Sequence, residues 1–588
     1  MSKIIFSLLS FLLFFNANAT TIQIIRGPYI QRTTQYETTL RWRTNTACSS
    51  EIQYGIGLNN LNNSILETTV TQEHTIRIPN LQPNTKYYYS IRANDTLLVQ
   101  DSVHYFTTYP ITGDKQKFTY WVTGDCGDGS INQKNVRNAY LNYIGNKNTD
   151  AWLLLGDNAY YYGTDTEYEN NFFNIYENNI MPHTTLFPAP GNHDYLGVGD
   201  AFGTRSNMAY YQSFVMPTEG ELNGYPSHNP SYYSYDIGTA HFISLDSYGR
   251  QEDATKLYDT LGAQAVWLKQ DLAQCTQTFK IAYWHHPPFT KGSHNSDTEA
   301  DLTAIRTKFI GILERYGVDL ILCGHSHCYE RSYFIHDFYG PDSTFNVVDN
   351  TLTTSNGYYD GSNNSCAYQK DNHDEGTIYV VSGSAGKMNT TQSPGYPHDA
   401  MVYSNTNKGG SVVIEIEDNR LDLKWLGYDG VVRDNFTLLK NTGKQHTIYL
   451  NTGQDTTLTA SWVGGYEWDN DATSRSVSIS PTANTTRYVT DPQQCITDTF
   501  SVIINGISGI QNTATNTAIV YTDANTVTSL GGIIQQLTLF DMQGKQIHTT
   551  IPYTTTVQLP SVATGIYLLT TTINSTTYYQ KIYLTINQ

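Results

Sequence analysis

The sequence is poor in charged residues, and in basic residues above all. Of its 588 residues only 15% are charged, and 35 Lys and Arg stand against 53 Asp and Glu, so that the formal net charge is −18. A protein with this balance repels polyanions at long range, which argues against nucleic acid as a binding partner. The many Thr, Asn, Tyr and Gly residues instead suit an extracellular protein rich in β-structure.

Long apolar runs are also missing. The run Ile4–Phe15 is too short to span a bilayer, which takes about 20 residues, and no later stretch approaches that length. Because a basic residue precedes this run and Asn16-Ala17-Asn18-Ala19 follows it, the segment has the parts of a signal peptide. We predict a signal peptide over residues 1–19 and a mature protein without a transmembrane segment.

Cysteine is sparse. The seven cysteines are odd in number and scattered along the chain, so they define no disulfide framework. A bridge between Cys328 and Cys366 is one hypothesis.

Five short motifs, each at the end of an apolar strand-like run, supply metal-ligating side chains. They are Gly124-Asp125-Cys126-Gly127, Gly156-Asp157-Asn158-Ala159-Tyr160, Gly191-Asn192-His193-Asp194, His285-His286-Pro287 and Gly324-His325-Ser326-His327. Because functional residues of α/β domains gather at the carboxyl ends of strands, we expect these side chains to meet at one edge of a sheet.

The ligand types indicate a pair of ions. Oxygen donors mixed with imidazoles suit Fe, Mn or Zn, and the near absence of Cys argues against a purely structural zinc site. Two ions that share a carboxylate can hold a hydroxide and both ends of an in-line phosphoryl displacement. Any one motif alone would be weak, because a lone Gly-Asp or His at a strand end is usually a turn residue; five in order predict a binuclear site.

In this order the motifs resemble those of the purple acid phosphatases, a branch of the binuclear metallophosphoesterases. In the wider superfamily the first motif usually reads Asp-x-His, but here Gly127 holds the third position. Tyr160, three residues after Asp157, supplies the replacement ligand in this family as a phenolate, which favours a ferric ion and gives a purple colour. The combination of Gly127 with Tyr160 is more specific than any single motif.

The resemblance implies a ligand set for each metal. The first metal would take Asp125, Asp157, Tyr160 and His327, and the second would take Asp157 as the bridge with Asn192, His285 and His325. The implied cofactor is Fe(III) with a divalent Fe, Zn or Mn ion. His286 has two interpretations, a donor that supports a ligand or a ligand in a shifted register, and we favour the first.

The resemblance also implies a mechanism. A metal-bridging hydroxide would attack a phosphate monoester, His193 would protonate the leaving group as general acid, and His294 would reach the phosphate. Glu330 and Arg331 would support His325 and His327, with a plain surface ion pair as the alternative.

The predicted function is therefore that of a secreted, metal-dependent phosphoric monoester hydrolase of the acid phosphatase type, acting on phosphate esters. The alternatives are a phosphodiesterase or nucleotide hydrolase on the same metal site, and a surface adhesin that has lost catalysis.

Strand and helix patterns predict several domains. Residues 22–108 alternate apolar and polar residues in short segments, which predicts an all-β sandwich, and Leu81–Tyr87 resembles the tyrosine corner of fibronectin type III modules. Residues 116–440 alternate strands with helices, which predicts an α/β layered domain. Gln264–Gln274 and Thr298–Gly317 have helical spacing. The family resemblance implies two β-sheets packed face to face, with helices outside.

The last part of the chain predicts β-sandwich modules. Residues 445–506 resemble bacterial immunoglobulin-like modules, and residues 508–588 resemble the C-terminal sorting domain of the type IX secretion system. One more structural β-module is the alternative for the final segment. The sorting-domain interpretation predicts that the type IX machinery of a Gram-negative bacterium exports the protein to the medium or the cell surface.

Overall fold

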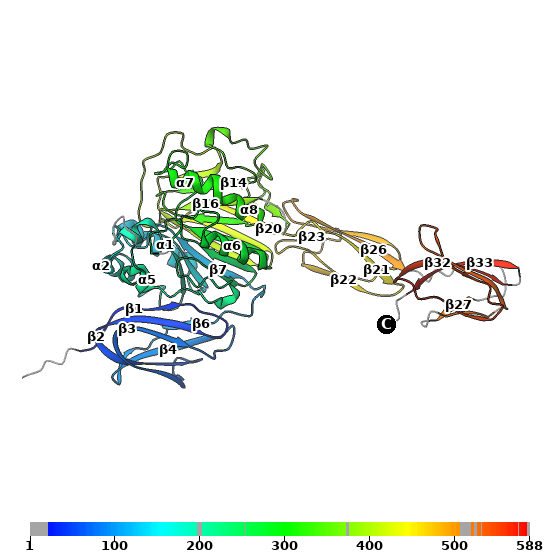
Figure 1. The fold of residues 1–588 in the computed structure, drawn as a ribbon, viewed down its shortest axis with the longest axis horizontal. Helices are drawn as coiled ribbons and strands as arrows, with labels where there is room; N and C mark the ends of the chain where they lie inside the picture. Colours follow the sequence, from blue (N-terminus) through cyan, green and yellow to red (C-terminus); the bar gives the residue numbers. More distant parts are fainter. Residues whose placement is uncertain are drawn as a thin grey trace, which may run out of the picture. The chain divides into compact units, whose positions relative to one another are not determined.

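The structure is a computed structural model that describes residues 21–196, 203–252, 254–371, 376–505, 519–522, 526–530, 532–573 and 575–584. The predicted signal peptide, residues 1–19, lies outside the described residues. The chain forms two compact units. The first comprises Met1–Lys444, Ala460–Glu467 and Val489–Asp498, and the second comprises Gln445–Thr459, Trp468–Tyr488 and Thr499–Gln588. Figure 1 shows the elements of both.

The N-terminal part of the first unit is all β. Its strands are β1 (Ile24–Gln31), β2 (Thr38–Gly55), β3 (Asn63–Ile78), β4 (Lys86–Ala93), β5 (Thr96–Val99) and β6 (Tyr105–Thr107). The long β2 pairs with β1 and β3 and, beyond a register shift between Arg43 and Cys48, also with β4. The shift bends the strand, so that the strands enclose a core around Trp42 and Tyr89. At the predicted tyrosine corner, the Tyr87 hydroxyl accepts a hydrogen bond from the backbone N–H of Gln82 at 2.9 Å.

The first large sheet joins this N-terminal part to the α/β part of the unit. Its strands lie in the order β15-β20-β19-β18-β7-β8-β9, and the sheet continues from β9 to β1. Their bounds are β15 (Tyr368–Lys370), β20 (Val432–Lys440), β19 (Arg420–Gly427), β18 (Gly410–Glu417), β7 (Phe118–Thr123), β8 (Ala151–Leu155) and β9 (Thr185–Ala189). A short parallel pairing of Ile30 with Thr185 and of Gln31 with Leu186 makes the connection. The N-terminal strands are therefore an extension of the first large sheet.

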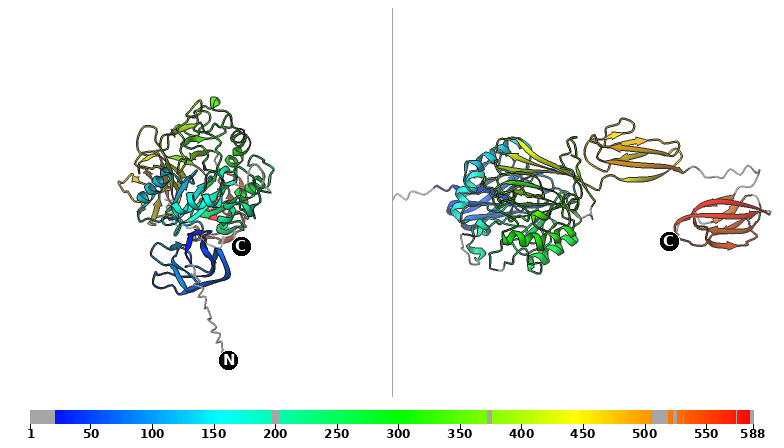
Figure 2. Two further views of the ribbon diagram at one scale, coloured as in Figure 1. Left: turned by 90° about the vertical axis from the view of Figure 1, so that its left-hand side faces the viewer. Right: turned by 90° about the horizontal axis from the view of Figure 1, so that it is seen from above.

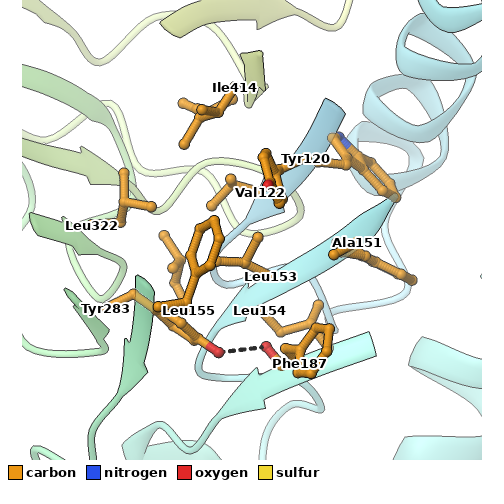
Figure 3. Packing of buried hydrophobic residues seen from close by; sticks show 14 of the residues in the cluster. Tyr120, Val122, Ala151, Leu153, Leu154, Leu155, Phe187, Tyr283, Leu322 and Ile414 are labelled. Carbon is orange, nitrogen blue, oxygen red and sulfur yellow. Dashed lines mark hydrogen bonds between the residues drawn. The ribbon is translucent and has the colours of Figure 1, made fainter. Parts of the chain in front are cut away.

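The second large sheet has seven strands in the order β10-β11-β12-β13-β16-β14-β17. Their bounds are β10 (Tyr233–Ile237), β11 (Ala240–Ser244), β12 (Phe279–Trp284), β13 (Leu320–Cys323), β16 (Thr377–Ser382), β14 (Tyr329–Ile335) and β17 (Met401–Asn405). One core fills the space between the two sheets: Leu153 and Phe187 lie opposite Tyr283 and Leu322 (Figure 3), and the Phe187 ring stacks on Tyr235 at 3.9 Å. The predicted pair of facing sheets is confirmed.

Helices lie outside the two sheets (Figure 2). The helical elements are α1 (Ile131–Ile144), α2 (Asp165–Tyr168), η1 (Glu169–Phe173), α3 (Asn174–Tyr176), α4 (Asn192–Tyr195), η3 (Arg205–Asn207), α5 (Ala209–Ser213), η4 (Glu221–Asn223), α6 (Ala263–Gln274), α7 (Ala300–Ala304), η5 (Ile305–Phe309), α8 (Ile310–Arg315) and η6 (Asp342–Thr344). The two helices predicted from periodicity are confirmed as α6 and as the run from α7 to α8. Their apolar faces cover the outer side of the second sheet, where Leu268 and Phe309 pack with Ile321. None of the described helices is long and apolar enough to cross a membrane.

The predicted bridge between Cys328 and Cys366 is wrong. Cys366 is bonded to Cys495, across a sequence separation of 129 residues and within the first unit. Cys328 is a buried free thiol, whose Sγ lies 3.6 Å from the Glu330 carboxylate. Cysteine spacing alone could not reveal the pairing, because Cys495 lies in Val489–Asp498, where the chain returns to the first unit after a segment of the second.

All described elements of the second unit are strands. The strands from residue 445 on, a few residues of which belong to the first unit, are β21 (Gln445–Asn451), β22 (Thr456–Thr459), β23 (Glu467–Trp468), β24 (Ser476–Ile479), β25 (Thr485–Thr490), β26 (Thr497–Asn505), β27 (Ile519–Thr522), β28 (Thr526–Ser529), β29 (Ile534–Phe540), β30 (Gln546–Thr550), β31 (Thr556–Gln558), β32 (Gly565–Ile573) and β33 (Thr576–Leu584). The last strands enclose a small core that includes Leu537 and Leu569. The predicted β-rich character of this region is confirmed.

A buried imidazolium on strand β11 of the second sheet provides a test of the fold. The ring nitrogens of His241 lie 2.7 Å from Asp236 Oδ1 and 2.9 Å from Asp271 Oδ2. Burial alone would lower the pKa of His241, but the hydrogen bonds to Asp236 and Asp271 raise it well above its ordinary value. His241→Gln leaves two buried carboxylates without their cation, and we expect a loss of about 3–5 kcal/mol in the free energy of unfolding near neutral pH.

The pH dependence of this loss follows from the raised pKa. The stabilisation from His241 is complete below the unfolded-state pKa of about 6.5 and is lost as the pH rises through the folded-state pKa. Urea unfolding of the first unit, compared at about pH 6 and about pH 9, should therefore show a smaller difference between wild type and variant at the higher pH. A difference that grows with pH would contradict the assignment.

Candidate metal centre

The five motifs lie at one edge of the two sheets, after β7, β8, β9, β12 and β13; four are on loops, and the third begins the short helix α4. Asp125, Asp157 and His325 have positive φ angles of 56°, 52° and 68°. Such values are uncommon for residues with a side chain and cluster at functional sites, where the surrounding structure enforces them. At these three positions the chain therefore turns sharply after its strand.

One group of donors gathers around the Asn192 amide. Asn192 Oδ1 lies 3.1 Å from His285 Nε2 and 3.1 Å from His325 Nδ1. His285 Nε2 lies 3.2 Å from Asp157 Oδ2. These four side chains are the ones that the family resemblance implies for the second metal.

A second group gathers around the Tyr160 hydroxyl. This hydroxyl lies 2.8 Å from Asp125 Oδ1 and 3.3 Å from His327 Nε2. His285 Nε2 is 4.0 Å from Asp125 Oδ1, so the two groups adjoin. The structure therefore brings together all seven predicted ligands.

The donor set fits cations. Asp125 and Asp157 are 0% and 1% exposed, and among the described residues only histidines form ion pairs with them. Burial disfavours the charge of Asp157, but His285 and His193 lower the pKa of this carboxyl below its usual range. Burying two carboxylates costs free energy unless positive charge compensates them. Ligand atoms of Asp125, Asp157 and His285 lie within 4.8 Å of one another, close enough to share a cation. The residues present therefore suit a bound metal.

Backbone contacts orient the ligands. His285 Nδ1 donates to Leu155 O at 2.8 Å, which leaves Nε2 as the nitrogen that faces the site. The backbone N–H of His325 donates to Asp125 Oδ2 at 2.8 Å, and that of His193 donates to Asp157 Oδ1 at 2.7 Å. Each carboxylate is thus held by the loop of another motif.

His286 adjoins the centre without facing the other ligands. Its Nδ1 lies 2.8 Å from Ser247 Oγ, and its ring lies 4.3 Å from that of His325. Burial lowers the pKa of His286 well below its ordinary value and that of His325 to about 4, so both imidazoles are neutral near pH 7. This placement favours the interpretation of His286 as a support for His325.

The two predicted catalytic histidines lie at the partly exposed edge of the site. His193 Nδ1 donates to Tyr161 O at 2.8 Å, and its Nε2 lies 3.9 Å from Asp157 Oδ2. The His294 ring stacks on His325 at 3.8 Å, and its Nδ1 lies 2.9 Å from Glu299 Oε2. Sequence reasoning did not single out Glu299, because only the folded loop brings it to His294.

Glu330 and Arg331 are not a surface ion pair. Both are fully buried, and Arg331 Nε donates to Asp434 Oδ2 at 2.6 Å, while the Glu330 carboxylate accepts a hydrogen bond from the backbone N–H of Lys291 at 3.2 Å. Glu330 therefore holds the loop that carries His294; among the contacts of the described residues, neither side chain bonds to His325 or His327.

Asp194 is a second residue of the site to which the sequence assigned no role. Its carboxylate accepts hydrogen bonds from the Gly191 N–H at 2.7 Å, the Asn158 N–H at 3.1 Å and the Tyr168 hydroxyl at 2.6 Å. Burial and the nearby charge of Asp157 raise its pKa to about 7. Asp194 ties the loop of Asp157 to the loop of Asn192, and its place inside the third motif was the available signal.

Comparisons with known proteins show which families the domains of this chain match. Residues 118–329 match the calcineurin-like phosphoesterase family, and residues 27–108 match the N-terminal domain of purple acid phosphatases. The chain contains both of these domains. Purple acid phosphatase from yellow lupin (Lupinus luteus) has the same fold, with a TM-score of 0.54, 17% identity and coverage of 70% of this chain and 74% of that chain.

Curated relatives are similar in sequence over part of their length. Purple acid phosphatase 15 of Arabidopsis thaliana is 26% identical over 292 residues, which is 45% of this chain and 50% of that protein. Purple acid phosphatase 13 of the same plant is 24% identical over 426 residues, which is 65% of this chain and 68% of that protein. Tartrate-resistant acid phosphatase type 5 of Oryctolagus cuniculus is 25% identical over 181 residues, which is 30% of this chain and 54% of that protein.

Substitution of Asp194 tests whether the two loops must be tied together. Asp194→Ala removes the acceptor shared by Gly191, Asn158 and Tyr168, and we expect metal affinity to fall by about 10- to 100-fold. Metal retained in competition with a chelator measures this effect. Asp150→Ala is the matched control, because Asp150 is a partly buried carboxyl that binds the Thr119 N–H at the opposite end of β8. Equal metal loss in the two variants would show that only stability has changed.

Proposed function

We propose that this protein is a metal-dependent phosphatase of the purple acid type that hydrolyses phosphate monoesters. The main observation behind this proposal is the pair of adjoining donor groups. In one group the Tyr160 hydroxyl contacts Asp125 and His327. In the other, the Asn192 side chain lies between His285 and His325. The matched families and the names of the relatives support the same reaction class.

The residues present would hold two ions, which we propose to be Fe(III) and a divalent Fe, Zn or Mn ion. Burial and the charges of Asp125 and Asp157 raise the pKa of the Tyr160 hydroxyl well above its ordinary value, so its ionised form needs a strong Lewis acid beside it. When bound, the ions would lower the pKa of a water to supply the nucleophile and would neutralise charge on the phosphate.

The protein side chains handle the remaining proton and the phosphate charge. Because Tyr161 O fixes His193 Nδ1–H, the Nε2–H of the imidazolium is the proton that can pass to the leaving oxygen. The contact between His294 Nδ1 and Glu299 likewise leaves His294 Nε2 to bind a phosphate oxygen. His193 is therefore the proposed general acid, and His294 the proposed phosphate-binding residue.

We further propose that the protein is exported. The apolar run followed by small residues at 1–19, and the resemblance of residues 508–588 to a type IX sorting domain, support secretion to the medium or the cell surface.

Substitution of His193 tests the proposed proton transfer. Metal-replete wild type should hydrolyse the monoester 4-nitrophenyl phosphate faster than the diester bis(4-nitrophenyl) phosphate, which has the same leaving group. His193→Ala should keep its metal and lose about 100-fold in kcat on alkyl phosphates, with a smaller loss on 4-nitrophenyl phosphate, whose leaving group needs no proton. His228→Ala is the control, because His228 is 71% exposed and pairs with Glu219. Equal losses of kcat on alkyl phosphates and on 4-nitrophenyl phosphate would instead assign His193 to phosphate binding. A wild type that prefers the diester would contradict the proposed monoesterase activity.

The colour of the protein tests the ferric phenolate. The purified wild type should absorb visible light, and Tyr160→Phe should lose this band while its circular dichroism is unchanged. Tyr162→Phe is the control, since Tyr162 is 59% exposed. A colourless wild type holding two zinc or manganese ions would remove the purple assignment and leave the hydrolase proposal in place.

A further inference from the structure

Lys387 lies beside the metal centre on the loop that follows β16. Its backbone N–H donates to Asp125 O at 2.8 Å, and the backbone N–H of Asn389 donates to His327 O at 3.3 Å. The loop is therefore bonded to two loops that carry metal ligands.

Two glycines allow this close approach. A Cβ atom on Gly383 would lie 2.2 Å from Ser326 O, and one on Gly386 would lie 2.8 Å from Asp125 O. Neither distance is tolerated between a side chain and backbone, so both positions need glycine where the loop meets the motifs. The backbone position of Lys387 relative to Asp125 is thus fixed by packing.

The ammonium group of Lys387 lies over the tyrosines that border the site. Its Nζ is 2.6 Å from the Tyr161 hydroxyl, 4.6 Å from the Tyr161 ring centre and 5.8 Å from the Tyr160 ring centre. Because the backbone oxygen of Tyr161 accepts the hydrogen bond from His193 Nδ1, Lys387 and His193 contact the same residue. The cation therefore lies on the side of the centre where the leaving group would be protonated.

The charge of Lys387 is not neutralised within the described part of the chain. No carboxylate there forms an ion pair with it, and its hydrogen bond goes to a neutral hydroxyl. The nearby carboxylate of Glu167 is held instead by the backbone N–H groups of Tyr161 and Tyr162. Tyr161 is 52% exposed, so the cation borders solvent in a protein whose net charge is −18. The ammonium group of Lys387 is therefore available to pair with an anionic group of a bound ligand.

We propose that Lys387 is a specificity-determining residue that binds a second anionic group, carried on the leaving-group side of the phosphate ester. The inference rests on the proposed phosphatase function. With His193 at the leaving oxygen, the remainder of the leaving group extends past Tyr161 toward Nζ, where a carboxylate or phosphate can pair with the ammonium. The favoured substrates are phosphate esters of anionic alcohols or phenols, and diphosphates.

A matched pair of substrates tests this proposal in the full-length, metal-replete protein. Phenyl phosphate and 4-carboxyphenyl phosphate share one ring and differ by one carboxylate. Lys387→Met should lower kcat/KM for the carboxylated ester about 10-fold, mainly through KM, and change that for phenyl phosphate by less than about twofold. Lys387→Arg should restore most of the loss, because a side-chain cation is regained. Inorganic diphosphate as a third substrate distinguishes a phosphate partner from a carboxylate partner, and a selective loss with either supports the proposal.

Controls separate this inference from the function on which it rests. Lys147→Met removes the same charge from an exposed site in the turn after α1 and should leave the ratio of the two kcat/KM values unchanged. The wild-type preference for the carboxylated ester should weaken as ionic strength rises. Equal losses on both esters, or no loss on either, would overturn the role of Lys387 while leaving a working phosphatase. A wild type inactive on both esters would instead refute the phosphatase proposal itself.

Discussion

The centre of the molecule is organised around two carboxylates, Asp125 and Asp157, that are buried where the strands of two sheets end. Removing such charges from water costs several kcal/mol each unless cations and hydrogen bonds compensate. Here the hydrogen bonds come from the backbone N–H groups of His325 and His193, each on the loop of another motif. The positions of the carboxylates therefore determine how the ligand loops pack against one another, and the remaining charge is left for metal ions to balance.

The N-terminal strands contribute to the same region. Arg43 donates to both oxygens of Asp165 at 2.7 Å, and Arg26 Nε donates to Glu169 at 2.6 Å, so both side chains hold the start of the helical segment from α2 to η1. Within that segment Glu167 binds the backbone N–H groups of Tyr161 and Tyr162. Since β1 is also a strand of the first large sheet, the N-terminal domain is part of the framework that positions the edge of the site.

Much of this arrangement could be predicted from sequence because it is local. The apolar runs before each motif predict strands, and ligands at strand ends must meet at one edge, so a metal site at that edge follows from short-range pattern. The assignment of the seven ligands and the two facing sheets followed instead from the resemblance of these motifs to a known family. Three pairings could not be predicted, since each depends on how separate segments approach one another after folding. These pairings are Cys366 with Cys495, Arg331 with Asp434, and Glu299 with His294. The chemistry of those side chains allows several partners, and only tertiary packing selects one.

Lys387 shows the same limit at a position that bears on substrate choice. No motif includes it, and its neighbours Gly383 and Gly386 resemble ordinary turn residues in the sequence. Their lack of side chains has a specific consequence, because it lets the loop approach Asp125 until backbone groups bond directly. The motifs determine the type of reaction through their metal ligands. The loop of Lys387 carries no predicted ligand, so its residues can change the charge near the leaving group without changing the metal centre. Reaction type and substrate preference would then be set by different loops of one site.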